Sequence, residues 1–257
     1  MRLYLLQLGL VPTDFGDVPL PGYLIQTDQD MNVLIDTGYP RSIRGRQEQA
    51  ATQLLEAFPD DEVTAFNATV VIRGVRDDAE DLIVNRLAVL GLGPQDINYL
   101  VCTHFDMDHA GNHDLFPNAE LVVQRRHYEV AHQHPRFRFF DIPWDTPDLR
   151  YRFVDGDTQL LPGIELIESS GHVPGHQSIL VRLPEIGPVL LAADAIVARD
   201  RLEPEVPPIL QDMDHAVARA STRKLIAITE REGVKLIVFG HDAEQWQTLK
   251  KSPEFYE

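Results

Sequence analysis

The stretch His104-Phe105-Asp106-Met107-Asp108-His109 places four side chains with metal-ligand chemistry close together in the sequence. This density is too high for an ordinary solvated run of charges. In an extended turn, positions 104, 106 and 108 project to a common side, and position 109 can bend inward. Imidazole together with carboxylate suits zinc, iron, manganese or cobalt. We therefore interpret residues 104–109 as the centre of a metal site.

Three distant segments offer further ligands. His172 and His176 lie in a loop that proline and glycine stiffen, Ser170-Gly171-His172-Val173-Pro174-Gly175-His176. Asp194 follows an apolar run, and His241 follows another in Phe239-Gly240-His241-Asp242. A carboxylate buried at the end of such a run needs a compensating partner. Together these residues predict two divalent metal ions about 3.5–4 Å apart, bridged by a carboxylate and by a water or hydroxide.

Apolar runs alternate with helical patterns along the chain, which predicts an α/β fold. Strands are expected at residues 2–11, 22–36 (a hairpin over Asp28-Gln29-Asp30), 98–102, 121–124, 159–169, 177–182, 189–193 and 235–239. His104, Asp194 and His241 then each follow the end of a strand, where loops converge over the sheet of an α/β fold.

Two helices are expected from capping residues and apolar spacing. The first follows Asp77 or Asp78 and ends at Gly91. The second runs from Asp212 or Asp214 to about Glu232, and its inward face is expected to carry Val217, Ala220, Leu225 and Ile228. Residues 203–208 are expected to form a stiff exposed connector. We expect a single domain over residues 1–257.

Composition limits the classes of function. The formal net charge is −17 at pH 7, which disfavours nucleic-acid and membrane partners because both carry negative charge. No apolar stretch approaches the roughly 18–20 residues of a membrane span, and the start of the chain lacks a signal-peptide core, so we expect a cytoplasmic protein. The single cysteine, Cys102, excludes an internal disulfide and a thiolate-rich metal site.

The motif His-x-Asp-x-Asp-His, the loop pattern Gly-His-x-x-Gly-His, the strand-end Asp194 and the late Gly240-His241 resemble the metallo-β-lactamase superfamily, and within it the N-acyl homoserine lactonases. The resemblance covers most of the chain and is weakest at residues 40–70 and 130–150. It implies a metallo-β-lactamase fold, an αβ/βα four-layer sandwich with two mixed sheets face to face and helices outside.

The resemblance also implies roles for individual residues. One metal would be held by His104, Asp106 and His172, and the other by Asp108, His109 and His241. Asp194 would bridge them, and His176 would orient a ligand. The expected function is a metal-dependent hydrolase that opens a lactone ring by attack of a metal-bridging hydroxide, with Asp108 or Asp194 relaying a proton to the leaving alkoxide.

Two positions depart from the family pattern. Asp106 stands where the family motif has histidine, and a carboxylate there favours iron, manganese or cobalt over zinc. Flavo-diiron proteins also carry a carboxylate at this point, although Asp106 could instead swing away and leave that metal weakly held. Lactonases place a tyrosine three residues after the bridging aspartate, where this chain has Val197. Tyr23 and Tyr128 are candidate substitutes for that tyrosine.

Alternative functions remain open at this stage. A small-molecule lactone or ester is the expected partner, but the same fold could act on another ester, a thioester, a phosphodiester or a β-lactam. A diiron redox protein is a further alternative, although the chain has no flavin or rubredoxin-like domain. A homodimer is also left open.

Several other residues allow two interpretations. Residues 137–151 could line the site of an acyl chain, or they could serve local packing or a subunit interface. Asp36 and Asp242 could support ligands or cap turns. We interpret five further histidines as surface or structural residues: His113, His127, His132, His134 and His215.

Overall fold

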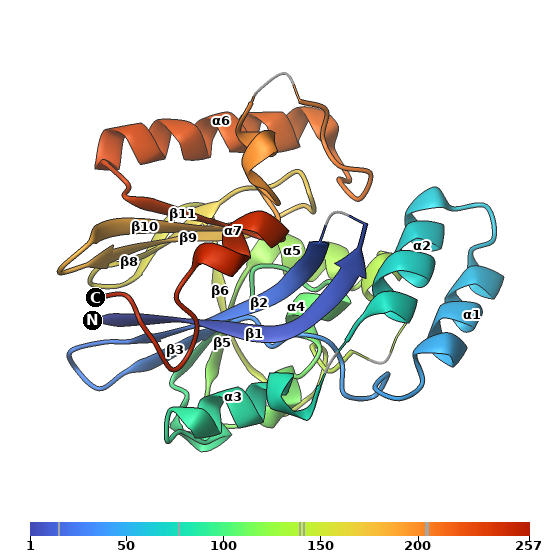
Figure 1. The fold of residues 1–257 in the computed structure, drawn as a ribbon, viewed down its shortest axis with the longest axis horizontal. Coiled ribbons are helices and arrows are strands. Elements are labelled where there is room, and N and C mark those ends of the chain that lie inside the picture. Colours follow the sequence, from blue (N-terminus) through green and yellow to red (C-terminus); the bar gives the residue numbers. More distant parts are fainter. Residues whose placement is uncertain (15, 77, 139, 141, 204–205) are drawn as a thin grey trace.

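Two β-sheets lie face to face, and helices cover their outer sides (Figure 1). The structure is a computed structural model that describes residues 1–257 except 15, 77, 139, 141 and 204–205. Over the described residues, one sheet has six strands in the order β1-β2-β3-β4-β5-β6, and the other has five in the order β11-β10-β9-β8-β7. The predicted α/β sandwich, with two mixed sheets face to face and helices outside, is confirmed. The single domain over residues 1–257 stays a prediction.

The first sheet begins with a long antiparallel hairpin and ends in parallel strands. Its strands are β1 (Arg2–Thr13), β2 (Gly16–Gln26), β3 (Asn32–Ile35), β4 (Tyr99–Val101), β5 (Glu120–Gln124) and β6 (Arg150–Val154). The strands β3 to β6 run parallel to one another. Because parallel strands end at a common edge, the loops after β4 and β5 emerge on the same side.

The second sheet is mostly antiparallel. Its strands are β7 (Thr158–Leu161), β8 (Ile164–Glu168), β9 (Gln177–Leu183), β10 (Gly187–Ala193) and β11 (Leu236–Phe239). The predicted strand 159–169 is therefore a hairpin of two strands, because Pro162 and Gly163 form a turn within it. β11 pairs in parallel with β10, which brings the residues after both strands to one edge.

Side chains of the first strand alternate between two cores, as the period of a strand requires. Leu3 and Leu5 lie in the core between the sheets, together with Val189 and Leu191 of the second sheet. Tyr4 and Leu6 face the other way, toward a core that includes Leu87 of the helix α3 (Ile83–Val89). Both faces of the first sheet are thus covered. The C-terminal end returns to β1, where the Leu3 amide donates to the Tyr256 carbonyl at 2.9 Å.

The helix predicted after Asp212 or Asp214 is α6 (His215–Glu232), and the Asp214 carboxylate caps it. Leu225 and Ile228 pack on the outer face of the second sheet, as predicted. The predicted inward positions Val217 and Ala220 are wrong, since both are exposed. The start of α6 rests on a loop instead. Gly171 approaches Ala218 so closely that a Cβ there would lie 2.2 Å from the Ala218 nitrogen.

The helix predicted after Asp77 or Asp78 starts later than expected. Asp77 lies outside the described residues, and Asp78 precedes a short 3-10 helix, η2 (Ala79–Asp81). The helix α3 follows at Ile83. Positions 204 and 205 of the predicted connector also lie outside the described residues. No helix in the described part of the chain has the length and apolar character to cross a membrane.

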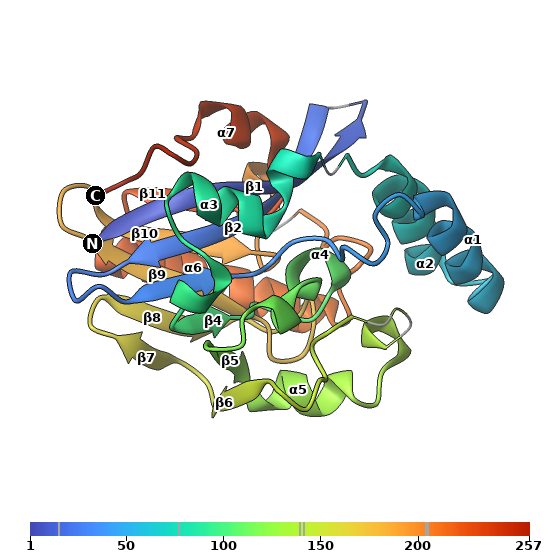
Figure 2. The same cartoon turned by 90° about the horizontal axis from the view of Figure 1, so that it is seen from below.

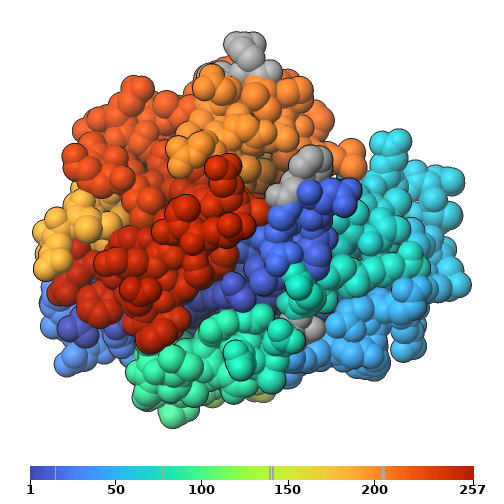
Figure 3. Space-filling model, viewed as in Figure 1, coloured from blue at the N-terminus to red at the C-terminus, as the bar shows by residue number. Residues whose placement is uncertain are grey.

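A helical lobe stands beside the β1–β2 hairpin (Figures 2 and 3). It comprises α1 (Gln47–Ala57), α2 (Glu62–Phe66) and the π-helix η1 (Asn67–Ile72). Ala51 and Leu54 of α1 pack with Ala68 and Ile72 of η1 in a core that also includes Val11 of β1 and Leu20 of β2. The other side of η1 is left to face the site described below.

Short segments complete the fold. They are η3 (Pro94–Asp96), α4 (Met107–Ala110), η4 (His113–Leu115), α5 (Arg125–Ala131), η5 (Pro135–Phe137), η6 (Arg199–Leu202) and α7 (Ala243–Thr248). Backbone hydrogen bonds join the loop after β3 to α4. The Thr37 amide donates to the His109 carbonyl at 2.7 Å, and the Gly111 amide donates to the Gly38 carbonyl at 3.0 Å. At Gly111, an added Cβ would lie 2.4 Å from the Gly38 oxygen and the Pro40 nitrogen.

We expect Gly111→Ala to destabilise the protein by about 1–3 kcal/mol, because the methyl group meets backbone atoms that cannot rotate away. Thermal unfolding of the metal-free protein measures the effect. The matched control is Gly74→Ala, whose Cβ would lie 3.6 Å from a Val11 methyl group, an ordinary contact. Equal melting temperatures for the two variants would contradict the crowding at Gly111.

Candidate metal centre

The predicted ligands come together from four loops at the ends of strands. His104 follows β4, His172 follows β8, Asp194 follows β10 and His241 follows β11. The segment 104–109 is extended up to Asp106 and then forms the single turn α4. Its geometry differs from the extended turn expected at 108, but the side chains still meet. His104, His109, His172 and Asp194 are buried, while Asp106, Asp108 and His241 are partly exposed.

The ligand atoms form two neighbouring sets. In the first, the Asp106 Oδ2 lies 3.2 Å from Nε2 of both His104 and His172. In the second, the Asp108 Oδ2 lies 3.6 Å from the His109 Nε2 and 3.8 Å from the His241 Nε2. Each set could hold one metal ion.

Asp194 lies between the two sets and offers one oxygen to each. Its Oδ2 is 3.5 Å from the His172 Nε2 and 3.9 Å from the His104 Nε2. Its Oδ1 is 3.4 Å from the His109 Nε2 and 3.1 Å from the His241 Nε2. This is the arrangement that a carboxylate bridging two ions requires.

The donor set fits divalent metals. Ligands about 2.0–2.2 Å from a tetrahedral ion lie about 3.3–3.6 Å from one another. The separations above, from 3.1 to 3.9 Å, scatter around that value. Three of the buried atoms have no hydrogen-bond partner among the described residues: His104 Nε2, His109 Nε2 and Asp194 Oδ1. Buried polar atoms without partners are costly, and metal ions in the two sets would satisfy all three.

Hydrogen bonds on the far side of each imidazole fix its orientation. His109 Nδ1 lies 2.8 Å from the Asp36 Oδ2, and His172 Nδ1 lies 3.0 Å from the Asp212 Oδ1. His241 Nδ1 lies 2.8 Å from the Pro19 carbonyl oxygen. Since a carbonyl only accepts, Nδ1 of His241 carries a proton, and Nε2 is the atom left to bind a metal once its own proton is displaced.

Asp36 supports a ligand rather than only forming a turn. It is buried and accepts hydrogen bonds at 2.8 Å from both the amide and the hydroxyl of Thr103, besides its contact with His109. The other open residue, Asp242, caps α7 by accepting from the Gln245 amide. Asp212 is a supporting residue that sequence reasoning considered only as a helix cap.

His176 lies beside the ligands without bonding to one. It is buried, and its ring centre is 5.2 Å from that of His104. Its Nδ1 lies 2.9 Å from the Ser169 hydroxyl, and its Nε2 has no hydrogen-bond partner among the described residues. Its role in orienting a ligand stays a prediction.

His127 joins two ligand loops. Its Nε2 accepts from the Phe105 amide at 2.8 Å, and its Nδ1 lies 2.9 Å from the Pro174 carbonyl oxygen. Burial lowers the pKa of His127 to about 4, so the ring is neutral and can accept. Within the described residues, the groups able to hold a metal do not include His113, His127, His132, His134 or His215.

The charges of the centre depend on one another. Burial lowers the pKa of His241, but Asp194 outweighs it and raises the value to about 9. His109 behaves alike, since Asp108 and Asp194 overcome the burial effect and raise its pKa well above the usual range. Burial raises the pKa of Asp194, yet His241 and His109 hold it well below the usual range. Without metal, protons therefore supply the positive charge that these carboxylates require.

Comparison with known proteins identifies the family. The family model described as the metallo-beta-lactamase superfamily matches residues 21–241. An N-acyl homoserine lactonase from a Bacillus species is 34% identical over 96% of this chain and 90% of its own length. The chain belongs to the metallo-beta-lactamase superfamily. It is a metallo-hydrolase of this fold and a homologue of the N-acyl homoserine lactonases.

Further relatives agree with this membership of the superfamily. N-acyl homoserine lactonase AttM from Rhizobium johnstonii is 32% identical over the whole of this chain and 98% of its own length. A solved structure of a mutant of Bacillus thuringiensis AiiA, with N-decanoyl-L-homoserine bound at its active site, has a TM-score of 0.81 and 29% identity. It covers 99% of this chain, and the match spans 98% of the AiiA chain.

In this member of the superfamily, a cavity of about 320 Å³ opens onto the ligands. Its polar end is formed by Asp106, Asp108, His172, Asp194 and His241, together with Arg136. Its apolar walls come from the β1–β2 hairpin and from the helical lobe: Val11, Val18, Leu20, Phe66, Val70 and Val71. Met107, Val197 and Ile209 add apolar surface.

None of the described residues in the segment 137–151 lines this cavity. Phe137 and Trp144 are buried in the core beneath the first sheet, and Trp144 stacks on Phe105 with ring centres 4.6 Å apart. Phe137 and Trp144 therefore serve local packing. Phe140 lines a neighbouring cavity with Met107 and Arg136, so an acyl-chain wall and a subunit interface stay predictions for the rest of the segment. Positions 139 and 141 lie outside the described residues.

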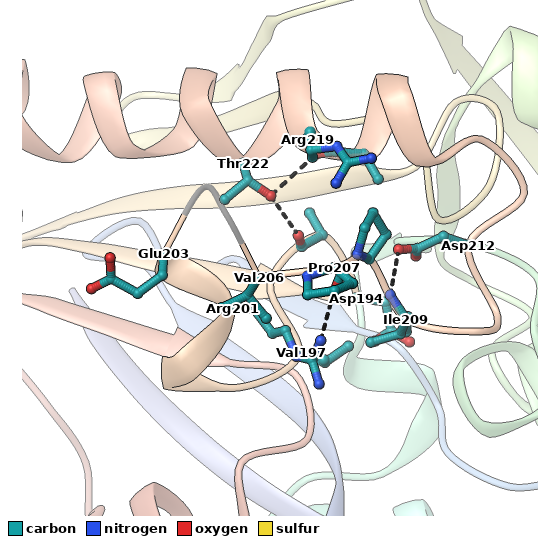
Figure 4. A pocket seen from close by; sticks show the side chains of 13 residues that line it. Asp194, Val197, Arg201, Glu203, Val206, Pro207, Ile209, Asp212, Arg219 and Thr222 are labelled. Carbon is teal, nitrogen blue, oxygen red and sulfur yellow. Dashed lines mark hydrogen bonds between the residues drawn. The ribbon is translucent and has the colours of Figure 1, made fainter.

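The two tyrosines suggested by the sequence as substitutes pack in the protein interior. Tyr128 packs against Tyr151 and Phe153, and Tyr23 is buried in the core between the sheets. Neither lines the cavity in the described part of the chain. Val197 does line it, and it also borders a smaller cavity of about 40 Å³ beside Asp194 and Asp212 (Figure 4).

Sequence reasoning missed Arg136 as a residue of the site. Its guanidinium forms a two-pronged ion pair with Asp106, with the Arg136 Nε donating to the Asp106 Oδ1 at 2.7 Å. It also contacts the His172 Nε2 at 3.0 Å. The position within a loop thirty residues from its partner carries no local pattern that would have indicated this pairing.

Metal binding to the metal-free protein is expected to release protons. Below pH 9 His241 holds a proton that a metal must displace, so affinity falls as the pH falls. Calorimetric titration with cobalt or zinc at pH 7.5, in two buffers of different ionisation enthalpy, measures the number released. His241→Gln should release fewer protons, and His215→Gln, an exposed histidine at the start of α6, should match the wild type. A binding enthalpy independent of the buffer would contradict this.

Proposed function

We propose that this protein hydrolyses the ester bond of a lactone ring, with a substrate like an N-acyl homoserine lactone. The observation that carries the proposal is the cavity, which has the candidate ligands at one end and an apolar wall along the other. An acyl homoserine lactone has the same division into a polar ring and an apolar chain. The curated relatives at 34% and 32% identity are named for action on this class of compound.

The size of the cavity supports a small-molecule substrate. Its volume of about 320 Å³ is at the lower end of the range of about 300–1,000 Å³ that is typical of ligand pockets. Phe66, Val70 and Val71 lie on one side of the helical lobe and would contact the acyl chain. Asn67 and Gln211 also line the cavity, and they would supply polar contacts to the amide.

We propose two divalent metal ions as cofactors, held by the two ligand sets and bridged by Asp194. When bound, such ions polarise a carbonyl oxygen and lower the pKa of water toward neutrality. The chain's own part is to fix the ligands. Asp36 and Asp212 hold the rings of His109 and His172 in place. The carboxylate at position 106 favours iron, manganese or cobalt in the first set, with zinc the alternative.

Ring opening requires a proton on the leaving alkoxide, and we assign this step to Asp108. Both oxygens of Asp194 face ligand imidazoles, so that carboxylate is fully engaged. Asp108 lines the cavity, and its side chain is 17% exposed. It therefore has access to both substrate and solvent.

Metal-loaded protein should release acid from N-acyl homoserine lactones of several chain lengths, measured by titration at constant pH. Asp108→Asn is expected to lower kcat by about a hundredfold or more, the usual contribution of a positioned proton carrier. Metal content measured on the same samples separates loss of proton transfer from loss of metal. Absence of ring opening at every chain length, in protein that holds two metals, would remove the lactone substrate.

One observation favours a second candidate, a hydrolase of the same fold acting on another ester, a thioester, a phosphodiester or a β-lactam. Val197 replaces the tyrosine with which lactonases polarise the carbonyl or support the leaving group, and no tyrosine lines the cavity among the described residues. The same acid-release assay on these other classes of substrate distinguishes the candidates.

Val197→Tyr should raise the rate of lactone opening by about tenfold, which corresponds to about 1.4 kcal/mol of transition-state stabilisation. The matched control is Val197→Phe, which adds the ring without the hydroxyl group and should give no gain. Equal rates for the two variants would show that the hydroxyl is not used, and would favour the second candidate.

Two further expectations stay predictions. These are the cytoplasmic location and the homodimer.

A further inference from the structure

Arg136 is the one cation of the described residues that contacts ligand atoms in both Asp106 and His172. We propose that Arg136 is a positioning residue that makes Asp106 a working metal ligand. It does so by neutralising the charge that the replacement of histidine by aspartate adds, and by holding the carboxylate in one orientation. The proposal rests on the two-metal centre proposed above.

The geometry of the pair fixes the carboxylate plane. The Arg136 Nε donates to the Asp106 Oδ1 at 2.7 Å, and the Nη2 donates to the Oδ2. Two parallel hydrogen bonds from the planar fork of an arginine define both position and rotation, which a lysine could not do. The sequence had left open whether Asp106 swings away from the centre. The ion pair with Arg136 keeps it at the centre.

The remaining donors of Arg136 are used by the protein. Its Nη1 donates to the Gln211 carbonyl at 2.6 Å, and its Nη2 contacts the His172 Nε2 at 3.0 Å. A metal ion would replace the contact with His172, because both need the same lone pair. The contacts with Asp106 are compatible with an ion, since a carboxylate oxygen has a second lone pair.

The charges show why the pair is needed. The carboxylates of the ligand sets, Asp106, Asp108 and Asp194, carry one more negative charge than a set with histidine at position 106. The guanidinium cancels that extra charge. The Arg136 and Asp106 side chains are 14% and 15% exposed, so water screens the pair little.

The backbone that carries Arg136 is held firmly. Arg136 lies in η5, and its amide donates to the His134 side chain at 3.3 Å. The next residue, Phe137, is fully buried, and its carbonyl accepts from the Trp144 indole at 2.9 Å. Phe137 and Trp144 thus hold the backbone next to Arg136 in place.

The test is metal binding, measured apart from activity. Metal per chain is determined by mass spectrometry after dialysis, and affinities are determined by competition with a chromophoric chelator. The wild type should bind two cobalt or zinc ions. Arg136→Gln should bind one of them about 10–100-fold more weakly, the usual effect of removing a residue that orients a ligand. The control Arg138→Gln, whose ion pair with Asp145 is exposed, should bind as the wild type does.

Two substitutions whose charge changes cancel make the test specific for charge compensation. In Asp106→His, the retained guanidinium faces a centre with one carboxylate fewer, so one ion should again bind weakly. The double variant Asp106→His, Arg136→Gln should recover two tightly bound ions, because both changes together restore the total charge. This pair of variants also decides the matter if Arg136→Gln alone does not fold.

Three results would overturn the proposal. Wild-type affinity in Arg136→Gln would show that the guanidinium is not needed, and tighter binding would show that it competes with the metal. A double variant no better than Asp106→His would exclude charge compensation. A wild type that binds fewer than two ions would overturn the two-metal centre itself. Two ions with the predicted variant effects, but without lactone opening, would leave this proposal standing and remove only the substrate.

Discussion

The Asp194 carboxylate, shared between two sets of imidazoles, is the constraint on which the rest of the site depends. Its two oxygens lie 3.1 Å from the His241 Nε2 and 3.5 Å from the His172 Nε2. A buried carboxylate is stable only where positive charge compensates it, and the imidazoles alone supply that charge only by taking up protons. The strand ends of both sheets must therefore meet at one point, because the histidines that face Asp194 come from both sheets.

The supporting contacts extend this constraint to residues far from the centre. The Pro19 carbonyl on β2 orients His241, and Asp36 after β3 orients His109. His127 connects the loop of His104 with the loop of His172. Each contact joins segments that are distant in sequence, so the metal centre is also a tertiary contact between the sheets. Changes that loosen the fold should therefore weaken metal binding, and metal should stabilise the fold.

The sequence predicted the parts that have local patterns. Apolar runs gave the strands, and a histidine or aspartate directly after such a run predicted His104, Asp194 and His241 at the converging ends. The helix face at Val217 was placed wrongly, because contact of the helix start with a loop overrode the local spacing. Tyr23 and Tyr128 were suggested only as replacements for a missing tyrosine, and neither lines the described cavity. Arg136 and the cavity wall of η1 lie in the stretches 130–150 and 40–70, where the family resemblance is weakest. A contact between residues so far apart in the sequence depends on the tertiary structure. No periodic pattern in the sequence predicts it.

The two departures from the lactonase pattern impose different demands on the chain. Asp106 adds a charge at a poorly solvated position, so stability itself requires a partner, and Arg136 is that partner. Val197 replaces a polar group with an apolar one on the cavity wall, which leaves no buried charge or donor to satisfy. Folding therefore does not require compensation at Val197, and its consequence falls on the substrate alone. The metal centre is thus constrained by stability and by chemistry together, whereas the leaving-group end of the cavity is constrained only by the reaction it serves.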